Sequence, residues 1–347
     1  MNKVFISGFG HFFPGEAIDT QRLNALIPNY DIKMIEDFFG VKTRHYISIS
    51  KTVEKSELNT TNMAAIAANM AIKDAKIELD DIDVLITNST TPDERLPNLA
   101  TLLQKKLQLK NVMTLDLRGG CSASMQSMMI ADIMIQSNNA KTVLLVGSEF
   151  TSQFYLKRLL NKNNPKMEDV VNGCLFADGS GALVVQSSDL LKDRLGRLPR
   201  VNYSNSKSCF YDEPYGFSVS TAKEKESKHS HRAIRKTLPK VMSRAYADLL
   251  QGSGKHIRDY DLIVIPQVNQ SMINLMSNNG VNSKLNNNKI CYYGNETGNV
   301  PAAAMFSAIS MAKHRGRFLD VDSIGVVSIE TASWNYAVAD LVMEDVQ

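Results

Sequence analysis

Residues 116–126 read Asp-Leu-Arg-Gly-Gly-Cys-Ser-Ala-Ser-Met-Gln, and this stretch decides both the fold and the candidate site. The apolar segment 113–117 predicts a buried strand that stops at two glycines, which allow a tight turn. The apolar residues 121–137 then predict a long helix. A thiol at the start of a helix lies near the positive end of the helix dipole and near unpaired backbone N–H groups, and both lower its pKa. We therefore predict that Cys121 is a nucleophile, whereas the alternative is a small buried cysteine without a chemical role.

Short apolar strands alternate with longer helical patterns along the whole chain, which is typical of an α/β protein. The expected strands are 4–7, 83–88, 113–117, 140–147, 182–186, 261–266, 324–329 and 337–344. The expected helices are 59–75, 96–107, 121–137, 233–251 and 302–312, and in 233–251 the apolar residues recur at helical spacing.

An internal echo predicts that the chain consists of two similar halves. Residues 80–88 (Asp-Asp-Ile-Asp-Val-Leu-Ile-Thr-Asn) and 258–266 (Arg-Asp-Tyr-Asp-Leu-Ile-Val-Ile-Pro) share an acidic and then aliphatic pattern, although so short a match also arises by chance. We place an N-terminal half at 1–187, which carries the cysteine, and a C-terminal half at 188–347. The polar stretch 187–232 is interpreted as a linker or loop.

The composition narrows the classes of protein. The chain has 347 residues, 44% of them hydrophobic and 22% charged, and a net charge of +3, which is too mild to indicate nucleic-acid binding. The four cysteines form no Cys-x-x-Cys pair, so a zinc ribbon or redox pair is not expected. No apolar run approaches the roughly 20 residues of a membrane-spanning helix, and no signal peptide is recognised. We expect a cytoplasmic protein with no metal and no cofactor.

Several stretches, in matching order, resemble the ketoacyl-acyl-carrier-protein synthase III family. They are residues 6–14 (Ile-Ser-Gly-Phe-Gly-His-Phe-Phe-Pro), 91–97 (Thr-Pro-Asp-Glu-Arg-Leu-Pro), 116–126 and 175–182 (Leu-Phe-Ala-Asp-Gly-Ser-Gly-Ala). The resemblance implies a thiolase fold, a duplicated five-layer αβαβα sandwich that is usually dimeric. It also implies acyl transfer, with an acyl carrier protein or an acyl thioester as partner.

The family's catalytic cysteine, histidine and asparagine can be carried over only in part. Cys121 matches the cysteine, and Asn299 in Gly-Asn-Val-Pro-Ala-Ala-Ala (298–304) matches the asparagine, with Asn295 as a rival. Where the family reads Pro-His-Gln-Ala-Asn, residues 266–270 read Pro-Gln-Val-Asn-Gln, so Gln267 takes the place of the histidine. An amide can donate a hydrogen bond to a thioester carbonyl but cannot take a proton near neutral pH.

Other positions also depart from the family pattern. The glycine-rich turn before the family's Trp-Gly is replaced by Ile-Glu-Thr-Ala-Ser-Trp-Asn (329–335), which keeps a backbone oxyanion donor but crowds the loop with side chains. We take Thr331 in this loop and Leu96, which the resemblance projects across the dimer, as substrate-binding candidates. Met34 and Glu36 stand where the family often has a tryptophan and an arginine for coenzyme A, and this favours a carrier-protein donor. The methionines at 125, 128, 129 and 134 are expected in the core or, alternatively, along an acyl tunnel.

These observations predict a ketosynthase III-like acyl-transfer enzyme. It would load an acyl group on Cys121 and condense it with a malonyl- or ketoacyl-type thioester, in specialised lipid or polyketide biosynthesis. One alternative is an acyltransferase that forms no carbon–carbon bond, and another is a non-catalytic thiolase-fold partner subunit. A homodimer is expected, and a heterodimer remains open.

Overall fold

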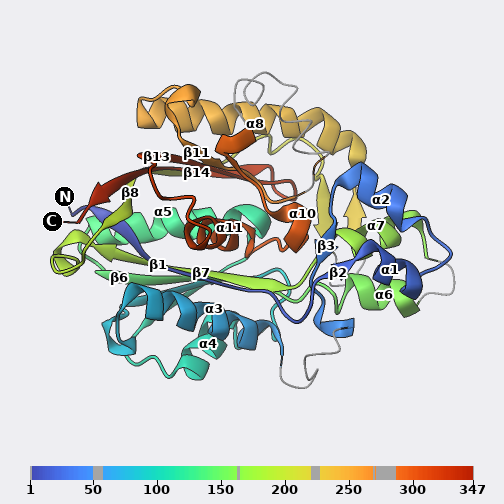
Figure 1. The fold of residues 1–347 in the computed structure, drawn as a ribbon, viewed down its shortest axis with the longest axis horizontal. Coiled ribbons are helices and arrows are strands. Elements are labelled where there is room, and N and C mark those ends of the chain that lie inside the picture. The colour runs from blue at the N-terminus through green and yellow to red at the C-terminus, as the bar shows by residue number, and fades with distance from the viewer. Residues whose placement is uncertain are drawn as a thin grey trace.

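The computed structural model describes residues 2–49, 58–161, 165–219, 227–268, 270 and 287–346. Its elements stack as five layers, in which helices and sheets alternate (Figure 1). The helices of the two outer layers are α3 (Thr60–Ala75) and α4 (Leu99–Leu107) on one side and α8 (His231–Ser253) on the other. The middle layer holds α5 (Ala123–Gln136) and α11 (Ala304–His314) between the two sheets. This arrangement is the αβαβα sandwich that the sequence predicted.

The strands of the two sheet layers repeat one topology. In the first layer the order is β1 (Val4–Phe12), β7 (Gly179–Ser187), β6 (Thr142–Glu149), β4 (Val84–Asn88) and β5 (Met113–Leu117). In the second it is β8 (Arg197–Ser208), β14 (Asn335–Asp345), β13 (Ser323–Glu330), β11 (Leu262–Val264) and β12 (Ile290–Cys291).

The pairing directions repeat as well as the order. β4 is parallel to β5 and β6, as β11 is parallel to β12 and β13. β7 is antiparallel to β6 and β1, as β14 is antiparallel to β13 and β8. A single pairing, Phe5 with Arg200, links the two layers through β1 and β8. The predicted duplication is therefore present, while a boundary at residue 187 stays a prediction.

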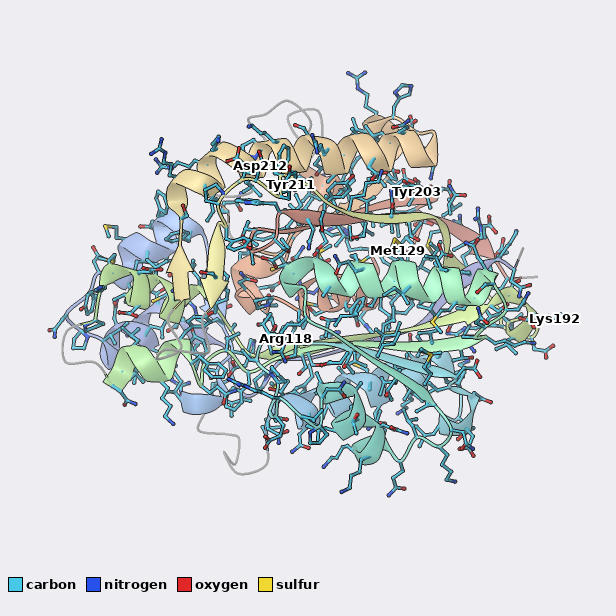
Figure 2. All side chains as sticks on the ribbon, turned by 180° about the vertical axis from the view of Figure 1, so that it is seen from behind. Arg118, Met129, Lys192, Tyr203, Tyr211 and Asp212 are labelled. Atoms are coloured by element: carbon cyan, nitrogen blue, oxygen red, sulfur yellow. The ribbon has the colours of Figure 1, made fainter. Side chains whose placement is uncertain are left out.

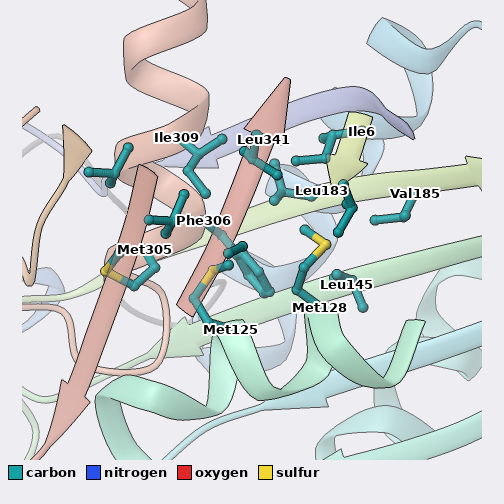
Figure 3. Packing of buried hydrophobic residues seen from close by; sticks show 14 of the residues in the cluster. Ile6, Met125, Met128, Leu145, Leu183, Val185, Met305, Phe306, Ile309 and Leu341 are labelled. Carbon is teal, nitrogen blue, oxygen red and sulfur yellow. The ribbon is translucent and has the colours of Figure 1, made fainter. Parts of the chain in front are cut away.

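The middle layer packs closely because small residues face it. A Cβ on Gly181 of β7 would lie 2.4 Å from the backbone nitrogen of Ser307, so this glycine allows α11 to reach the sheet. Met125 and Met128 of α5 are buried against Phe306 of α11 and strands of the first layer (Figure 3). These two methionines belong to the core, which is the first of the two positions that the sequence analysis expected.

Shorter elements extend one end of the sandwich (Figure 1). They are β2 (Ile18–Asp19), α1 (Thr20–Leu26), α2 (Ile32–Phe39), β3 (Thr43–Arg44), α6 (Tyr155–Asn161), α7 (Met167–Leu175), β9 (Phe217–Val219) and β10 (Ser227–His229). The family-like stretches hold this end and the sheet together. Asp93 accepts the N–H groups of Thr60 and Thr61 at the start of α3, and Asp178 accepts the N–H groups of Ile47 and Ser152.

All predicted strands and helices have counterparts, but the interpretation of 187–232 as a linker is wrong. This stretch contains β8, which pairs with β14 along its whole length. Sequence analysis missed this strand because its side chains are largely polar. In the structure they form hydrogen bonds with neighbouring helices: Tyr203 and Asn205 donate to Asp248 of α8, and Ser204 donates to Asp132 of α5.

The helix expected at 96–107 begins only at Leu99, because Asn98 accepts the N–H of Thr101 as its cap. Within the described ranges, no helix is long and apolar enough to cross a membrane.

Candidate active site

Cys121 lies in the turn between β5 and α5. The turn is a single 3-10 turn, Gly120–Ser122, and the α-helix begins two residues after the cysteine, at Ala123. Gly120 has a φ of +58°, and a Cβ at this position would lie 1.8 Å from the Oε2 atom of Glu330. The second glycine of the sequence motif is therefore required both by its backbone conformation and by the carboxyl group beside it.

Glu330 is the unexpected member of the site. It is the last residue of β13, is 5% exposed, and directs its carboxylate to the cysteine turn. The Cys121 N–H donates to Oε2 at 2.5 Å, and the Ala332 N–H donates to Oε1 at 2.7 Å. The carboxyl group therefore lies beside the residue that carries the thiol. The loop that sequence analysis expected to be crowded by side chains thus places an acid group directly on the candidate nucleophile.

The electrostatics of Cys121 differ from the expectation. Burial raises the pKa of the Cys121 thiol well above its ordinary value, and the nearby carboxyl groups of Glu330 and Glu149 raise it further. Burial also raises the pKa of the Glu330 carboxyl itself. The prediction that the helix start lowers the pKa of the thiol is therefore wrong in direction, because desolvation and two acid groups outweigh the backbone dipoles.

Glu149, the last residue of β6, is completely buried on the other side of the site. Its carboxylate accepts the N–H and hydroxyl of Thr90 at 2.9 and 2.8 Å and the hydroxyl of Thr91 at 2.5 Å. It also accepts the N–H of Ala302 at 3.2 Å, two residues before α11. Burial raises the pKa of this carboxyl despite these donors.

Asn299 lies between α10 (Gly294–Thr297) and α11, beside the start of the buried helix. Its N–H donates to the Leu175 carbonyl at 2.8 Å, and its carbonyl accepts the Ala177 N–H at 2.9 Å, so the family-like 175–182 turn fixes its backbone. Its side-chain Oδ1 is buried and has no hydrogen-bond partner among the described residues. The rival Asn295 lies in α10, where its carbonyl accepts the Lys42 N–H. The catalytic role of Asn299 stays a prediction.

The side-chain amide of Gln267 is engaged with the backbone. Its Nε2 donates to the carbonyls of Ile265 at 2.6 Å and Cys291 at 3.0 Å. Its Oε1 accepts the Tyr293 N–H at 2.6 Å, and the residue is 3% exposed. Both N–H groups of the amide are therefore in use, and they tie the segment after β11 to β12. Its catalytic role also stays a prediction, but this geometry gives the amide a structural task.

Asn88 is a candidate that sequence analysis missed. It ends β4 next to Gly147 of β6, and neither atom of its buried amide has a partner among the described residues. A Cβ on Gly147 would meet both the Ala302 carbonyl and the Asn88 Oδ1, so the amide lies at the entrance to α11. The only signal in the sequence is a polar residue at the end of a buried strand that begins with three apolar residues.

The remaining predicted residues lie apart from this cluster or are held by other groups. Leu96 is 86% exposed, and the Thr331 carbonyl accepts the Gly216 N–H at 3.0 Å. Met34 is 54% exposed, and Glu36 bonds Lys33 and the Thr20 hydroxyl.

The two histidines of the first half form hydrogen bonds with groups outside this cluster. His11 bonds the Ser310 hydroxyl at 2.9 Å, and His45 bonds the Pro14 carbonyl at 3.2 Å. The side chains of His229 and His231 lie outside the described residues. Among the side chains that are described, no group of acidic, histidine and cysteine residues could hold a metal ion.

More than half of the chain matches the model of a known family. The family model described as FAE1/Type III polyketide synthase-like protein matches residues 35–258. The chain belongs to this family. The beta-ketoacyl-[acyl-carrier-protein] synthase III of Ehrlichia chaffeensis is 28% identical over 317 residues, which cover 91% of this chain and 92% of that protein.

Solved structures agree with this assignment at the level of the fold. OleA of Xanthomonas campestris, crystallised with bound lauric acid and lauroyl-CoA, matches with a TM-score of 0.85 at 21% identity, covering 99% of both chains. The 3-oxoacyl-[acyl-carrier-protein] synthase III of Aquifex aeolicus matches with a TM-score of 0.80 at 22% identity, covering 98% of this chain and 99% of that chain. The predicted thiolase fold, ketosynthase III-like family and acyltransferase-type enzyme class are confirmed.

Proposed function

We propose that this protein accepts an acyl group from a thioester donor onto Cys121 and condenses it with a second, malonyl- or ketoacyl-type thioester. The observation that carries the proposal is the placement of the Cys121 thiol at the start of the buried helix α5, in a turn that only glycine at position 120 allows. In a family of acyl-condensing enzymes, a thiol in this position is the group that takes the acyl chain.

The donor is proposed to be an acyl group on a carrier protein or on coenzyme A. The relative from Ehrlichia chaffeensis is named for the acyl-carrier protein, and the Xanthomonas campestris protein holds lauroyl-CoA. Met34 and Glu36 offer no aromatic face and no cation for coenzyme A, so we favour the carrier protein. Asn299 and Asn88 are proposed to hold thioester carbonyls through their side-chain NH2 groups. Both amide atoms of Asn88 and the Oδ1 of Asn299 are buried without a hydrogen-bond partner in the described structure, so neither amide is fully engaged by the protein.

Transfer of the acyl group without condensation is the second candidate. It is favoured by one observation, the engagement of the Gln267 amide with the backbone. With Gln267 held in this way, one of the two groups that would polarise a malonyl carbonyl is lost. Decarboxylation then depends on the asparagines alone.

A homodimer is proposed through the open edge of the first sheet layer. β5 is the outermost strand of that layer, and its residue Met113 is 51% exposed. Ile133 on the adjoining helix α5 is 57% exposed, and Arg118 and Met129 lie on the same face (Figure 2). An open edge strand flanked by exposed apolar side chains favours pairing with a second chain.

The test is the intact mass of the protein after incubation with acyl-carrier-protein and acyl-coenzyme A donors of several chain lengths. We expect an added acyl mass that is absent in Cys121→Ala and retained in Cys174→Ala, which removes a buried thiol elsewhere. Release of CO2 from a malonyl thioester by the acylated protein separates condensation from simple transfer, and native mass of the same sample reports the dimer. Absence of an adduct with every donor would contradict the proposed function.

A further inference from the structure

We propose that Glu330 is a further catalytic residue, the base that takes the proton of the Cys121 thiol during acyl transfer and returns it to the departing thiol. This inference rests on the proposed function. It identifies which group performs the proton transfer in a chain where Gln267 takes the place of the family's histidine.

The contacts of Glu330 place it in reach of both the nucleophile and its backbone. Oε2 lies 2.5 Å from the Cys121 nitrogen, which places the carboxyl group beside the residue that carries the thiol. The same carboxyl group raises the pKa of that thiol. Oε1 is held by the Ala332 N–H, so the carboxyl group is oriented from its other end. A position beside the nucleophilic residue and a fixed orientation are what the geometry supplies toward a general base.

The surroundings leave Glu330 without a competing cation. Ser328 donates its hydroxyl to the Cys121 carbonyl at 2.9 Å, and the Ser122 hydroxyl bonds Asn335; all three side chains are neutral. The other titratable group that acts on Cys121 is Glu149 of β6. In the described structure, no lysine, arginine or histidine forms an ion pair with Glu330 or Glu149. A carboxylate without a counter-charge in a buried site is a stronger base than one at the surface.

The proton transfer balances without any co-reactant. The Cys121 sulfur attacks the carbonyl carbon of the donor thioester, and the S–H proton passes to the Glu330 carboxylate as the new carbon–sulfur bond forms. The donor's carbon–sulfur bond then breaks, and its thiolate takes the proton from Glu330, so that a free thiol departs. A neutral acid accepts the Cys121 N–H more weakly than a carboxylate does, so protonation of Glu330 also frees that donor for the oxyanion.

The first experiment needs no acyl donor and therefore stands even if the proposed function fails. Alkylation of Cys121 by iodoacetamide is followed by peptide mass spectrometry between pH 5 and 10. In the wild type we expect the rate to level off over an interval of pH, because the thiol proton can move to Glu330 without leaving the pair. In Glu330→Gln this plateau disappears, and the rate rises about tenfold per pH unit until the thiol itself ionises.

Two further variants separate proton transfer from a structural role. Glu149→Gln changes the equivalent buried carboxyl group, whose hydrogen-bond partners in the described structure are Thr90, Thr91 and Ala302, and it should keep the plateau. Glu330→Asp retains an acid group and should restore part of the plateau, which also covers the case in which Glu330→Gln folds poorly. Parallel pH profiles in the wild type and Glu330→Gln would overturn the inference, as would an unreactive Cys121 in both.

The second experiment is single-turnover acylation with the donor identified above. Loss of a general base lowers such rates by about 10² to 10⁴, and we expect a fall in this range for Glu330→Gln at pH 7. If Glu330→Gln instead acylates as fast as the wild type or faster, then Glu330 only occupies the oxyanion position and is no base.

Discussion

Glu149 and Glu330 occupy the same place in the two halves of the molecule, but Glu330 bonds the backbone of a cysteine whereas Glu149 bonds that of an alanine. Each is the last residue of an eight-residue strand, β6 or β13, and each is buried. Each accepts a backbone N–H two residues before the central helix of the other half, that of Ala302 for Glu149 and that of Cys121 for Glu330. The duplication therefore places a carboxylate twice at the start of a central helix, where it accepts a backbone N–H.

The difference lies in the other donors. Glu149 is surrounded by Thr90 and Thr91 in addition to Ala302, so its carboxylate has three neutral partners that hold it in place. Glu330 accepts the N–H of Cys121, which carries a thiol, whereas Glu149 accepts the N–H of Ala302, whose side chain is a methyl group. The carboxylate of Glu149 therefore has a structural role, whereas the equivalent carboxylate of Glu330 is placed to exchange a proton with a thiol.

The largest effect should come from removing each carboxyl group. Glu149→Ala leaves the Thr90 and Ala302 N–H groups and two hydroxyls without a buried acceptor, at about 1–3 kcal/mol for each group left unpaired. Glu330→Ala leaves fewer donors, so we expect it to lower the free energy of unfolding less. Urea unfolding of both variants measures this order, with the wild type as reference. An equal or larger loss in Glu330→Ala would show that Glu330 also has a mainly structural role.

The side-chain amides of Gln267 and Asn299 differ in the same way, because one is bonded to the protein backbone and the other is free to bind a substrate. Gln267→Ala removes three hydrogen bonds to backbone groups, and we expect it to lower the free energy of unfolding by about 2–4 kcal/mol. Asn299→Ala removes an Oδ1 that has no described partner, so its stability should change by less than about 1 kcal/mol while condensation is lost.

Thermal unfolding and CO2 release from a malonyl thioester measure the two properties on the same samples. Gln267→His serves as a matched variant, because it introduces the histidine of the family at this position. If Gln267→His raised the rate of condensation without lowering stability, the hydrogen bonds of the Gln267 amide would not be needed for the structure.

The sequence predicted the part of the site that is local in the chain. Two glycines before Cys121 and an apolar run after it identify the turn and the helix, because strand, turn and helix signals lie within some twenty residues. Glu330 is 209 residues away from Cys121, and nothing local indicates that its side chain turns to the thiol. The reversed pKa direction follows from that contact, so it could not be predicted either.

The fold shows the same limit. β8 was missed because a strand with polar side chains lacks the apolar pattern, and its partners on α8 and α5 are distant in the chain. The repeat could be recognised in the sequence at 80–88 and 258–266. The equivalence of Glu149 and Glu330 is seen only in the structure, where they end the corresponding strands β6 and β13.

The smallest effect concerns how stability depends on pH at the two glutamates. Burial raises the pKa of both carboxyl groups above their ordinary 4.5. Between 4.5 and the raised pKa, the folded protein holds a proton that the unfolded chain has lost, so this contribution to stability is complete below pH 4.5 and is lost as pH rises through the raised pKa.

A glutamine does not titrate, so Glu149→Gln and Glu330→Gln should each gain stability relative to the wild type as pH rises from 4 to 8. The gain is about 1.4 kcal/mol for each unit by which a pKa is raised. Melting temperatures of the three proteins across this interval measure it, and the slope matters rather than the offset, because the substitution itself changes hydrogen bonds. A relative loss of stability with rising pH would mean that the backbone donors around the carboxylate outweigh its burial, and Glu330 would then be a weaker base than its surroundings indicate.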